Sequence, residues 1–297
     1  MKIRHSFSDN LFQFCSITVF CIIFIGAVYP FYYIFIVSFS NPQAVQRGAV
    51  RFLPSEITLN NYKQVFALPG IFSSFFVSAA RTVTGTICTL FFTSILAYTV
   101  TKPQLPARKF FYRFSVIAMY INAGLIPWYL TLRSLGLKDN FLVYILPYAV
   151  SSYSLILIKT YIEQVSAPLE ESAMIDGAGY FLTYYRIVLP VCTPVLAAVA
   201  VFTAVSQWNQ WIDNLLLVNI NHLKTLQMTL LEFLNQADFI AREARSSGGL
   251  TAGSSAAITP FSIRMTVTMV VTIPILLIYP FMQRYFIKGI MIGAIKG

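Results

Sequence analysis

The chain has 297 residues, of which 57% are hydrophobic and 11% are charged, and its mean hydropathy is +0.69. Soluble domains carry about 25% charged residues, so this composition excludes a soluble protein and indicates an integral membrane protein. The net charge of +10 comes from basic residues scattered between apolar runs. This pattern excludes a concentrated nucleic-acid-binding face and carries topology information instead.

Six apolar segments are long enough to cross a membrane. A bilayer core about 30 Å thick needs roughly 20 apolar residues in a helix, and backbone groups in lipid must be satisfied within the segment. The sequence therefore predicts an all-α, polytopic membrane protein with one domain over 1–297. The expected spans are about 11–39, 71–100, 110–130, 141–162, 188–208 and 263–287.

The connection between the second and third spans gives the orientation. Lys102, Arg108, Lys109 and Arg113 lie within residues 101–113, which contain no acid. Short loops rich in Lys and Arg stay in the cytoplasm, so parity places both termini and the loop that begins at Glu163 inside. The long loop 209–260 is then external.

The second span contains Arg81, a charge about ten residues from its outer end. A charge at membrane depth usually faces the bundle interior or a water-filled cavity. Arg81 is therefore interpreted as part of a translocation path or as the anchor of a polar network. The alternative is that its side chain reaches the outer surface.

The aromatic and amide residues at the end of the fifth span allow two interpretations. Gln207, Trp208 and Asn209 combine rings with amides, which suits a sugar surface, and Trp128 near the end of the third span raises the same question. Trp is also enriched at membrane interfaces, so an aromatic belt is the alternative.

No residues suited to catalysis, metal binding or nucleotide binding come together in the sequence. There is no phosphate-binding glycine loop, and His5 and His222 lack ligand spacing. The four cysteines are interpreted as small core residues. We therefore expect no enzyme activity and no cofactor in this chain, so any ATP hydrolysis would reside in another chain.

The acidic stretch 169–194 interrupts the apolar chain. Glu170 and Glu171 lie where a helix dipole favours acids, Ala173 and Gly177 share one face, and Gly177 with Gly179 ends the helix. A second helix then runs into Pro190 and the fifth span. The element is interpreted as a short docking helix joined through a second helix to a membrane span. The alternative is an amphipathic connector that lies on the membrane.

The spacing of this stretch resembles the EAA loop of ABC importer permeases. That signature is E-A-A, three residues, G, nine residues, I-x-L-P, and Ser172 is the one departure. The matching residues are Glu171, Ala173, Gly177, Ile187, Leu189 and Pro190, and Asp176 is similar to the carbohydrate-uptake branch. The whole chain resembles the maltose-type (MalG-like) permeases, near the subgroup of lipoprotein-linked and acidic oligo- or polysaccharide permeases.

The resemblance implies a type I ABC importer permease fold in the bacterial cytoplasmic (inner) membrane. The coupling loop 163–190 would dock on an ATPase through Glu170, Glu171, Ser172, Ala173, Asp176 and Gly177, with Leu189 and Pro190 as anchors. The implied partners are a second homologous permease, two cytoplasmic ABC ATPase subunits that bind ATP and Mg, and an extracytoplasmic solute-binding protein. The substrate would be a carbohydrate, such as alginate or galacturonate chains.

A second class of function stays open at this point. A stand-alone secondary transporter or membrane enzyme would act without any ATPase. Secondary transporters usually contain internal repeats, and the two halves of this sequence show none.

Overall fold

The computed structural model describes residues 7–121, 123–164, 167–235 and 260–294, and within these ranges every regular element is a helix. The helices belong to two compact units. The first consists of Met1–Pro69 with Glu232–Thr272, and the second of Gly70–Leu231 with Ile273–Gly297. The all-α fold class is thus confirmed, and the single membrane domain stays a prediction.

The first unit contains α1 (Phe7–Ser38), α2 (Pro42–Gln46), α3 (Asn60–Ala67) and the start of α14 (Pro260–Ala294). Its small core is formed by Ile36, Val37 and Val50, with Met265 packed against them. Asn61 is buried and donates hydrogen bonds to the carbonyls of Ser38 (3.0 Å) and Ser40 (2.9 Å), which ties α3 to the end of α1. Burial raises the pKa of Tyr62, although its hydrogen bond with Ser38 opposes this effect.

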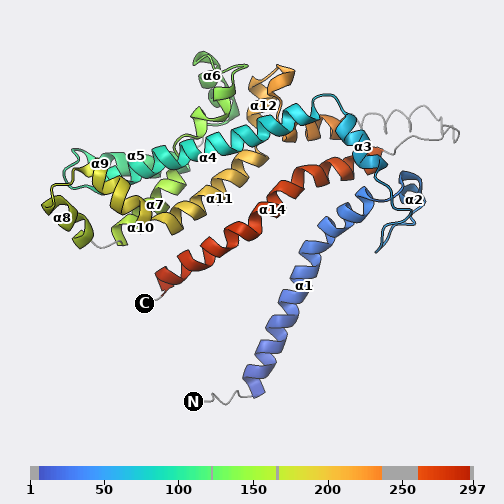
Figure 1. Ribbon diagram of the computed structural model, residues 1–297, viewed down its shortest axis with the longest axis horizontal. Helices are drawn as coiled ribbons and strands as arrows, with labels where there is room; N and C mark the ends of the chain where they lie inside the picture. The colour runs from blue at the N-terminus through green and yellow to red at the C-terminus, as the bar shows by residue number, and fades with distance from the viewer. Residues whose placement is uncertain (1–6, 122, 165–166, 236–259, 295–297) are drawn as a thin grey trace. The chain divides into compact units, whose positions relative to one another are not determined.

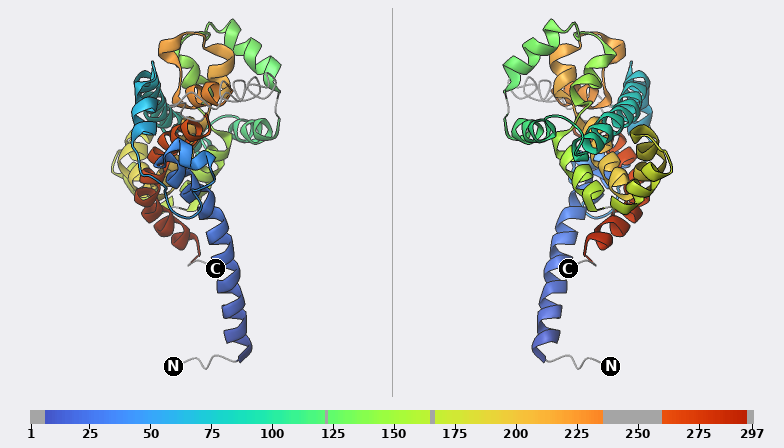
Figure 2. Two further views of the ribbon diagram at one scale, coloured as in Figure 1. Left: turned by 90° about the vertical axis from the view of Figure 1, so that its right-hand side faces the viewer. Right: turned by 90° about the vertical axis from the view of Figure 1, so that its left-hand side faces the viewer.

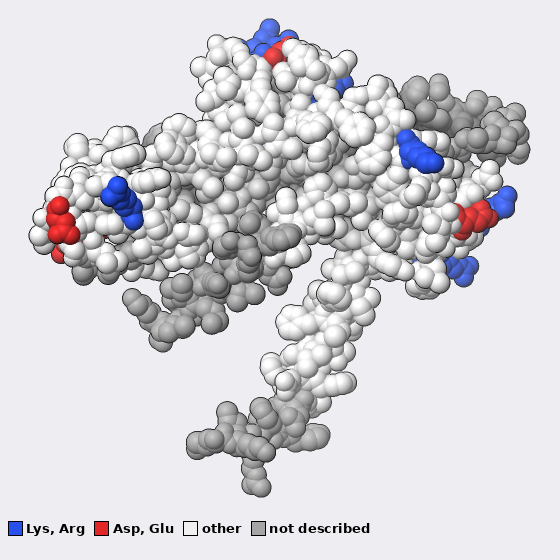
Figure 3. Space-filling view, in the orientation of Figure 1, with Lys and Arg blue, Asp and Glu red and all other residues white. Residues whose placement is uncertain are grey.

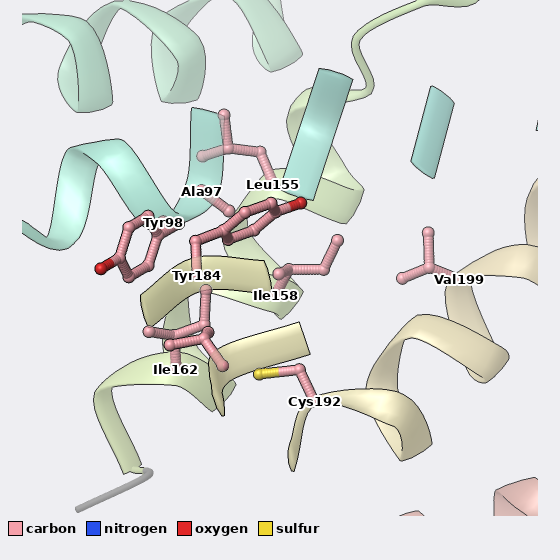
Figure 4. Close-up of a cluster of buried hydrophobic side chains, with 9 residues drawn as sticks. Ala97, Tyr98, Leu155, Ile158, Ile162, Tyr184, Cys192 and Val199 are labelled. Atoms are coloured by element: carbon pink, nitrogen blue, oxygen red, sulfur yellow. The ribbon is translucent and has the colours of Figure 1, made fainter. Parts of the chain in front are cut away.

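The second unit is built around α4 (Ile71–Thr101). This helix contacts α7 (Ser152–Gln164) and α11 (Thr193–Asn209), which also contact each other. The three helices lie side by side in Figure 1 and stay together in both views of Figure 2. A buried cluster fills the space between them, and in Figure 4 the ring of Tyr184 lies at its centre between Tyr98 and Ile158.

Shorter helices complete the second unit. They are α5 (Arg108–Tyr120), α6 (Leu125–Ser134), η1 (Phe141–Tyr144), η2 (Leu146–Tyr148), α8 (Ala167–Ile175), α9 (Tyr180–Thr183), η3 (Tyr184–Val188), α10 (Leu189–Val191), α12 (Ile212–Leu217) and η4 (Asn221–Leu223). Residues 226–235 are also helical, and the remainder of the predicted external loop, residues 236–259, lies outside the described residues.

Among the described residues, three helical stretches are long and apolar enough to cross a membrane, or five if each of two bent helix pairs counts as one span. The three are Leu11–Ser38, Ile71–Thr101 and Phe261–Ile278. They agree closely with the first, second and sixth expected spans. On the face shown in Figure 3, charged side chains occupy a few separate places and the rest of the visible described surface is uncharged.

The expected third span, 110–130, is not one helix, and this part of the prediction was wrong. Helix α5 ends at Tyr120 and α6 begins at Leu125. Gly124 has φ +84° and ψ 173°, an extended positive-φ conformation that favours glycine and that a continuous helix does not contain. Pro127 adds to the break, because its ring has no N–H and clashes with the carbonyl four residues earlier.

The expected fourth and fifth spans are also bent. Residues Phe141–Tyr148 and Ser152–Gln164 meet at 46°, and Tyr180–Val191 and Thr193–Asn209 meet at 79°. At the sharper bend Pro194 has no N–H to donate to the carbonyl of Pro190. The Thr193 hydroxyl donates to that carbonyl instead, at 2.7 Å, so the break leaves the oxygen satisfied.

Candidate functional site

Helix α8 and its C-terminal turn carry six of the eight predicted coupling residues. Glu170 lies in the first turn, where the partial positive charge of the helix N-terminus favours a carboxylate. The chain leaves α8 through two hydrogen bonds: Gly177 N–H donates to the Met174 carbonyl (3.1 Å), and Ala178 N–H donates to the Ala173 carbonyl (2.9 Å). This pair of bonds is the Schellman motif, and it needs a left-handed residue at its centre.

Gly177 supplies that left-handed residue, with φ +84°. A Cβ atom at Gly177 would meet nothing within 4 Å. The glycine is therefore required by backbone conformation and not by close packing inside this chain. The position agrees with the expectation that Gly177 ends the helix.

The exposed surface of α8 differs from the predicted docking face. Ala173 is only 8% exposed, because α8 packs against α9 and η3, so Ala173 and Gly177 do not form one open surface. Glu171, Ser172 and Asp176 are exposed. Ile175 is 86% exposed and was missed from the sequence. The available signal was an apolar residue directly before the Asp-Gly turn in a polar helix.

A lysine from the end of α4 holds α8. Lys102 is the C-cap of α4, and its ammonium group pairs with the Glu170 carboxylate. The same ammonium lies 4.1 Å from the centre of the Tyr98 ring, a cation–π contact. Tyr98 in turn lies 5.3 Å, centroid to centroid, from Tyr184, which links this end of α4 to the chain that follows α8. Among the coupling residues, Glu170 therefore has an identified intramolecular partner.

Leu189 and Pro190 occupy the joint between the loop and the membrane helix. They follow the π-helical turn Tyr184–Val188 and precede the 79° bend into α11. π-Helical turns are rare and are frequent at functional sites. Leu189 packs on the buried cluster of the second unit, and Pro190 is exposed. The two anchors thus lie where α9 and α11 change direction.

Arg81 is fully buried and anchors a polar network. Its guanidinium makes two hydrogen bonds to the Asp213 carboxylate, at 3.1 Å and 2.5 Å, and both side chains are 0% exposed. It also donates to the Gln207 side chain (3.0 Å) and to the Gln210 carbonyl (3.0 Å). The ring of Tyr144 lies 4.6 Å from the guanidinium carbon.

The network distinguishes between the interpretations of Arg81. Its side chain is engaged at Nε and at both terminal nitrogens, so it does not reach the outer surface. A buried charge needs a partner and additional hydrogen bonds to be tolerated, and Asp213 with Gln207 provides both. The pairing with Asp213, 132 residues later, was missed because no local pattern indicates it.

Of the other predicted path residues, Gln207 bonds Arg81, and the remaining three make different contacts. Trp208 is 7% exposed and its ring meets Phe75 edge-on at 6.0 Å, so it offers no free stacking face for a sugar. Trp128 packs on the cluster around Tyr144 and Leu217. Asn209 is exposed and accepts a hydrogen bond from Gln227 at 3.0 Å.

Comparison with known proteins identifies the family. No family model matches the chain. Protein LplC of Bacillus subtilis (strain 168) is 35% identical over 295 residues, which is 98% of this chain and 96% of the relative. The chain belongs to the carbohydrate-uptake family of ABC importer permeases.

Two further matches support this family. The polygalacturonan/rhamnogalacturonan transport system permease protein YtcP of the same organism is 32% identical over 270 residues, 91% of this chain and 93% of the relative. The crystal structure of a bacterial ABC transporter involved in the import of the acidic polysaccharide alginate contains a chain with TM-score 0.85 and 28% identity. That match covers 96% of this permease and all of the other chain.

Membership of the family confirms the resemblance drawn from the residues between Glu171 and Pro190. The chain is a membrane-embedded transporter subunit with an ABC importer permease fold. Among the described residues, no group of three or more His, Cys, Asp or Glu side chains is arranged to hold a metal ion.

Proposed function

We propose that this permease transports a carbohydrate across the bacterial cytoplasmic (inner) membrane in a complex driven by separate ATPase subunits. The complex would contain a second homologous permease, two ABC ATPases that hold ATP and Mg, and an extracytoplasmic solute-binding protein. The observation that carries the proposal is α8. It is a capped helix with exposed Glu171, Asp176 and Ile175, and it is tied to α4 through Lys102 and Glu170.

The proposed topology has six spans with both termini in the cytoplasm. The three long apolar helices and the two bent pairs would supply five spans. The stretch from α5 through α6 would supply the one remaining span, which is broken and is the third in chain order. Four basic residues between α4 and the middle of α5 support a cytoplasmic position for this connection, and α8 would then lie on the same side.

The topology is tested by labelling single cysteines in intact cells. Gln104→Cys should react with a membrane-impermeant maleimide only after the membrane is opened. Lys138→Cys, between the third and fourth proposed spans, should react from outside in intact cells. The reverse pattern would contradict the proposed orientation.

The proposed substrate is an oligosaccharide or polysaccharide, including acidic chains of the alginate or galacturonate type. The names of two matched proteins support this class, since one is a polygalacturonan/rhamnogalacturonan permease and the other belongs to an alginate importer. The glycerol-3-phosphate permease UgpE of Brucella abortus is also similar, at 25% identity, so a small phosphorylated polyol belongs in any substrate panel.

The test is uptake by the complex reconstituted in proteoliposomes. Labelled neutral and acidic oligosaccharides would be supplied with the binding protein outside and ATP inside. The proposal predicts uptake that requires both ATP and the binding protein. Uptake by the purified single chain without the ATPase would instead identify a stand-alone secondary transporter.

A further inference from the structure

The connection between α2 and α3 carries large apolar side chains that the chain does not cover. Phe52, Leu53 and Ile57 are 71%, 73% and 74% exposed. The connection belongs entirely to the first unit, away from α8 and from the Arg81 network. Apolar side chains gathered on a surface mark contact with another protein or with a membrane.

Residues 50–58, which we call the return loop, run back along α1 from its end. Val50 is buried and packs against the last residues of α1. The Phe52 carbonyl then accepts a hydrogen bond from the hydroxyl of Tyr32, which lies in α1 six residues before Ser38 (Figure 1). A helix rises 1.5 Å per residue, so the tip of the loop lies about 9 Å back from the end of α1.

The second half of the return loop comes back to the end of α1. The Ser55 N–H donates to the Ser40 hydroxyl at 3.1 Å, and the Thr58 N–H donates to the Phe39 carbonyl at 2.8 Å. Ile57 therefore lies level with the end of α1, whereas Leu53 lies farther back along the helix. These bonds give two equally exposed side chains two different depths.

The length of α1 shows where these depths fall in a bilayer. Its apolar run, Leu11–Ser38, has 28 residues. In a helix this run is about 42 Å long, which matches the roughly 40–45 Å of a bilayer that includes its headgroups. A level about 9 Å from the end of the run is then close to the boundary between headgroups and acyl chains. Tyr32 and Tyr33 lie at this level, and tyrosine is enriched at that boundary.

The polar groups of the return loop suit this depth. Irregular backbone next to acyl chains needs partners for its polar groups, and the Phe52 carbonyl has one in Tyr32. Arg51 is exposed and makes no ion pair among the described residues, so its long side chain can extend from the tip toward the headgroups. The acid of the loop, Glu56, lies in its second half and accepts a hydrogen bond from Asn41 at 2.7 Å.

We infer that the return loop is an interfacial anchor that inserts Phe52 and Leu53 into the outer leaflet of the membrane, with Arg51 among the headgroups. The side of the membrane rests on the proposed topology. A lipid surface is the occupant that the geometry favours, because the loop turns back from the end of a membrane span toward the bilayer. The most apolar stretch of α1 has no residue buried within the chain, and interfacial aromatic and basic residues fix the tilt of such a helix.

The inference is tested with fluorescent labels at two depths. Leu53→Cys and Ile57→Cys would each carry an environment-sensitive maleimide, in a background with the four native cysteines replaced by serine. The two positions are matched controls because they are equally exposed. In the complex reconstituted in proteoliposomes, a nitroxide on the lipid acyl chain just below the headgroup should quench the label at position 53 several-fold more than the label at position 57. Aqueous iodide should show the opposite preference.

A third variant tests what holds the loop at this depth. Tyr32→Phe removes the hydroxyl that bonds the Phe52 carbonyl, so the label at position 53 should lose most of its lipid quenching while position 57 stays unchanged. Equal iodide quenching at both positions in the Tyr32 protein would overturn the anchor. Protection of position 53 from both quenchers would also overturn it, because a protein would then cover the loop. These readouts do not involve uptake, so the proposed function stands in either case.

Discussion

Helix α4 carries two ion pairs, one at Arg81 in its first half and one at its C-cap Lys102, and the pairs differ in almost every physical respect. Arg81 and Asp213 are both 0% exposed, bonded through two hydrogen bonds, and supported by Gln207. Lys102 and Glu170 are 15% and 14% exposed at their side chains and share one contact, with the Tyr98 ring against the lysine. The first pair belongs to the permanent architecture, whereas the second holds an element that has few other tertiary contacts.

This difference shows how one membrane helix can hold one neighbouring element rigidly and another only loosely. A fully buried pair is costly to break, because either partner left alone is an uncompensated charge in a low-dielectric interior. A partly exposed pair can exchange its contacts for water at a small cost. We therefore expect α12 to stay fixed to α4 through Arg81, and α8 to change position relative to α4 when a partner acts on it.

The largest expected effect follows from breaking the buried pair. Asp213→Asn should destabilise the chain by about 3–5 kcal/mol, because Arg81 loses its counter-ion while buried. The measurement is the melting temperature of the detergent-solubilised protein. Arg81→Leu combined with Asp213→Leu should recover most of the loss. A double variant as unstable as the two single variants added together would contradict the coupling of this pair.

A smaller effect is expected at the C-terminus of α8. Gly177→Ala forces an L-residue into the left-handed region, which costs about 1–2 kcal/mol, although the side chain meets nothing. Hydrogen exchange at the amides of Gly177 and Ala178 should therefore increase. Gly177→Asn is the matched control, because Asn tolerates this conformation better, and it should exchange nearly as slowly as wild type. Equal exchange in all three proteins would show that the Schellman turn does not need Gly177.

The partly exposed pair of Lys102 and Glu170 should contribute still less to the stability of the chain. Glu170→Gln is expected to lower stability by at most about 1 kcal/mol, but to reduce uptake per ATP hydrolysed, because α8 loses its connection to α4. Glu163→Gln is the control, since it breaks the more exposed pair with Lys159 at the end of α7. It should cost about 0.3–0.5 kcal/mol and leave the transport ratio unchanged. An equal effect of the two variants on that ratio would remove any special role for Lys102.

The sequence predicted the helices that depend on composition alone. The second span, expected at 71–100, is observed as Ile71–Thr101, because no proline or acid interrupts this mostly apolar run before Lys102 and Pro103. The end of α8 at Gly177 was equally predictable, since few residues other than glycine adopt that conformation readily. Both features depend on local physics that the adjacent residues determine.

Features that depend on distant contacts could not be predicted. The pairing of Arg81 with Asp213 joins residues 132 positions apart, and no periodicity in either segment indicates it. The burial of Ala173 depends on how α9 and η3 fold back on α8. The break in the third span could have been predicted in part, because Gly124 and Pro127 are local signals for the end of a helix. The apolar composition of residues 110–130 led to the prediction of one continuous helix instead.

The measurement that tests the account most directly is a cross-link from the exposed tip of α8. A photoreactive maleimide would be attached to Ile175→Cys in a background with the four native cysteines replaced by serine. The control is Ile57→Cys, because Ile57 is 74% exposed against 86% for Ile175, and it lies on the proposed external side. The account predicts an adduct with the ATPase subunit from position 175 alone. No adduct from position 175, or an equal adduct from position 57, would contradict α8 as the place where the ATPase docks.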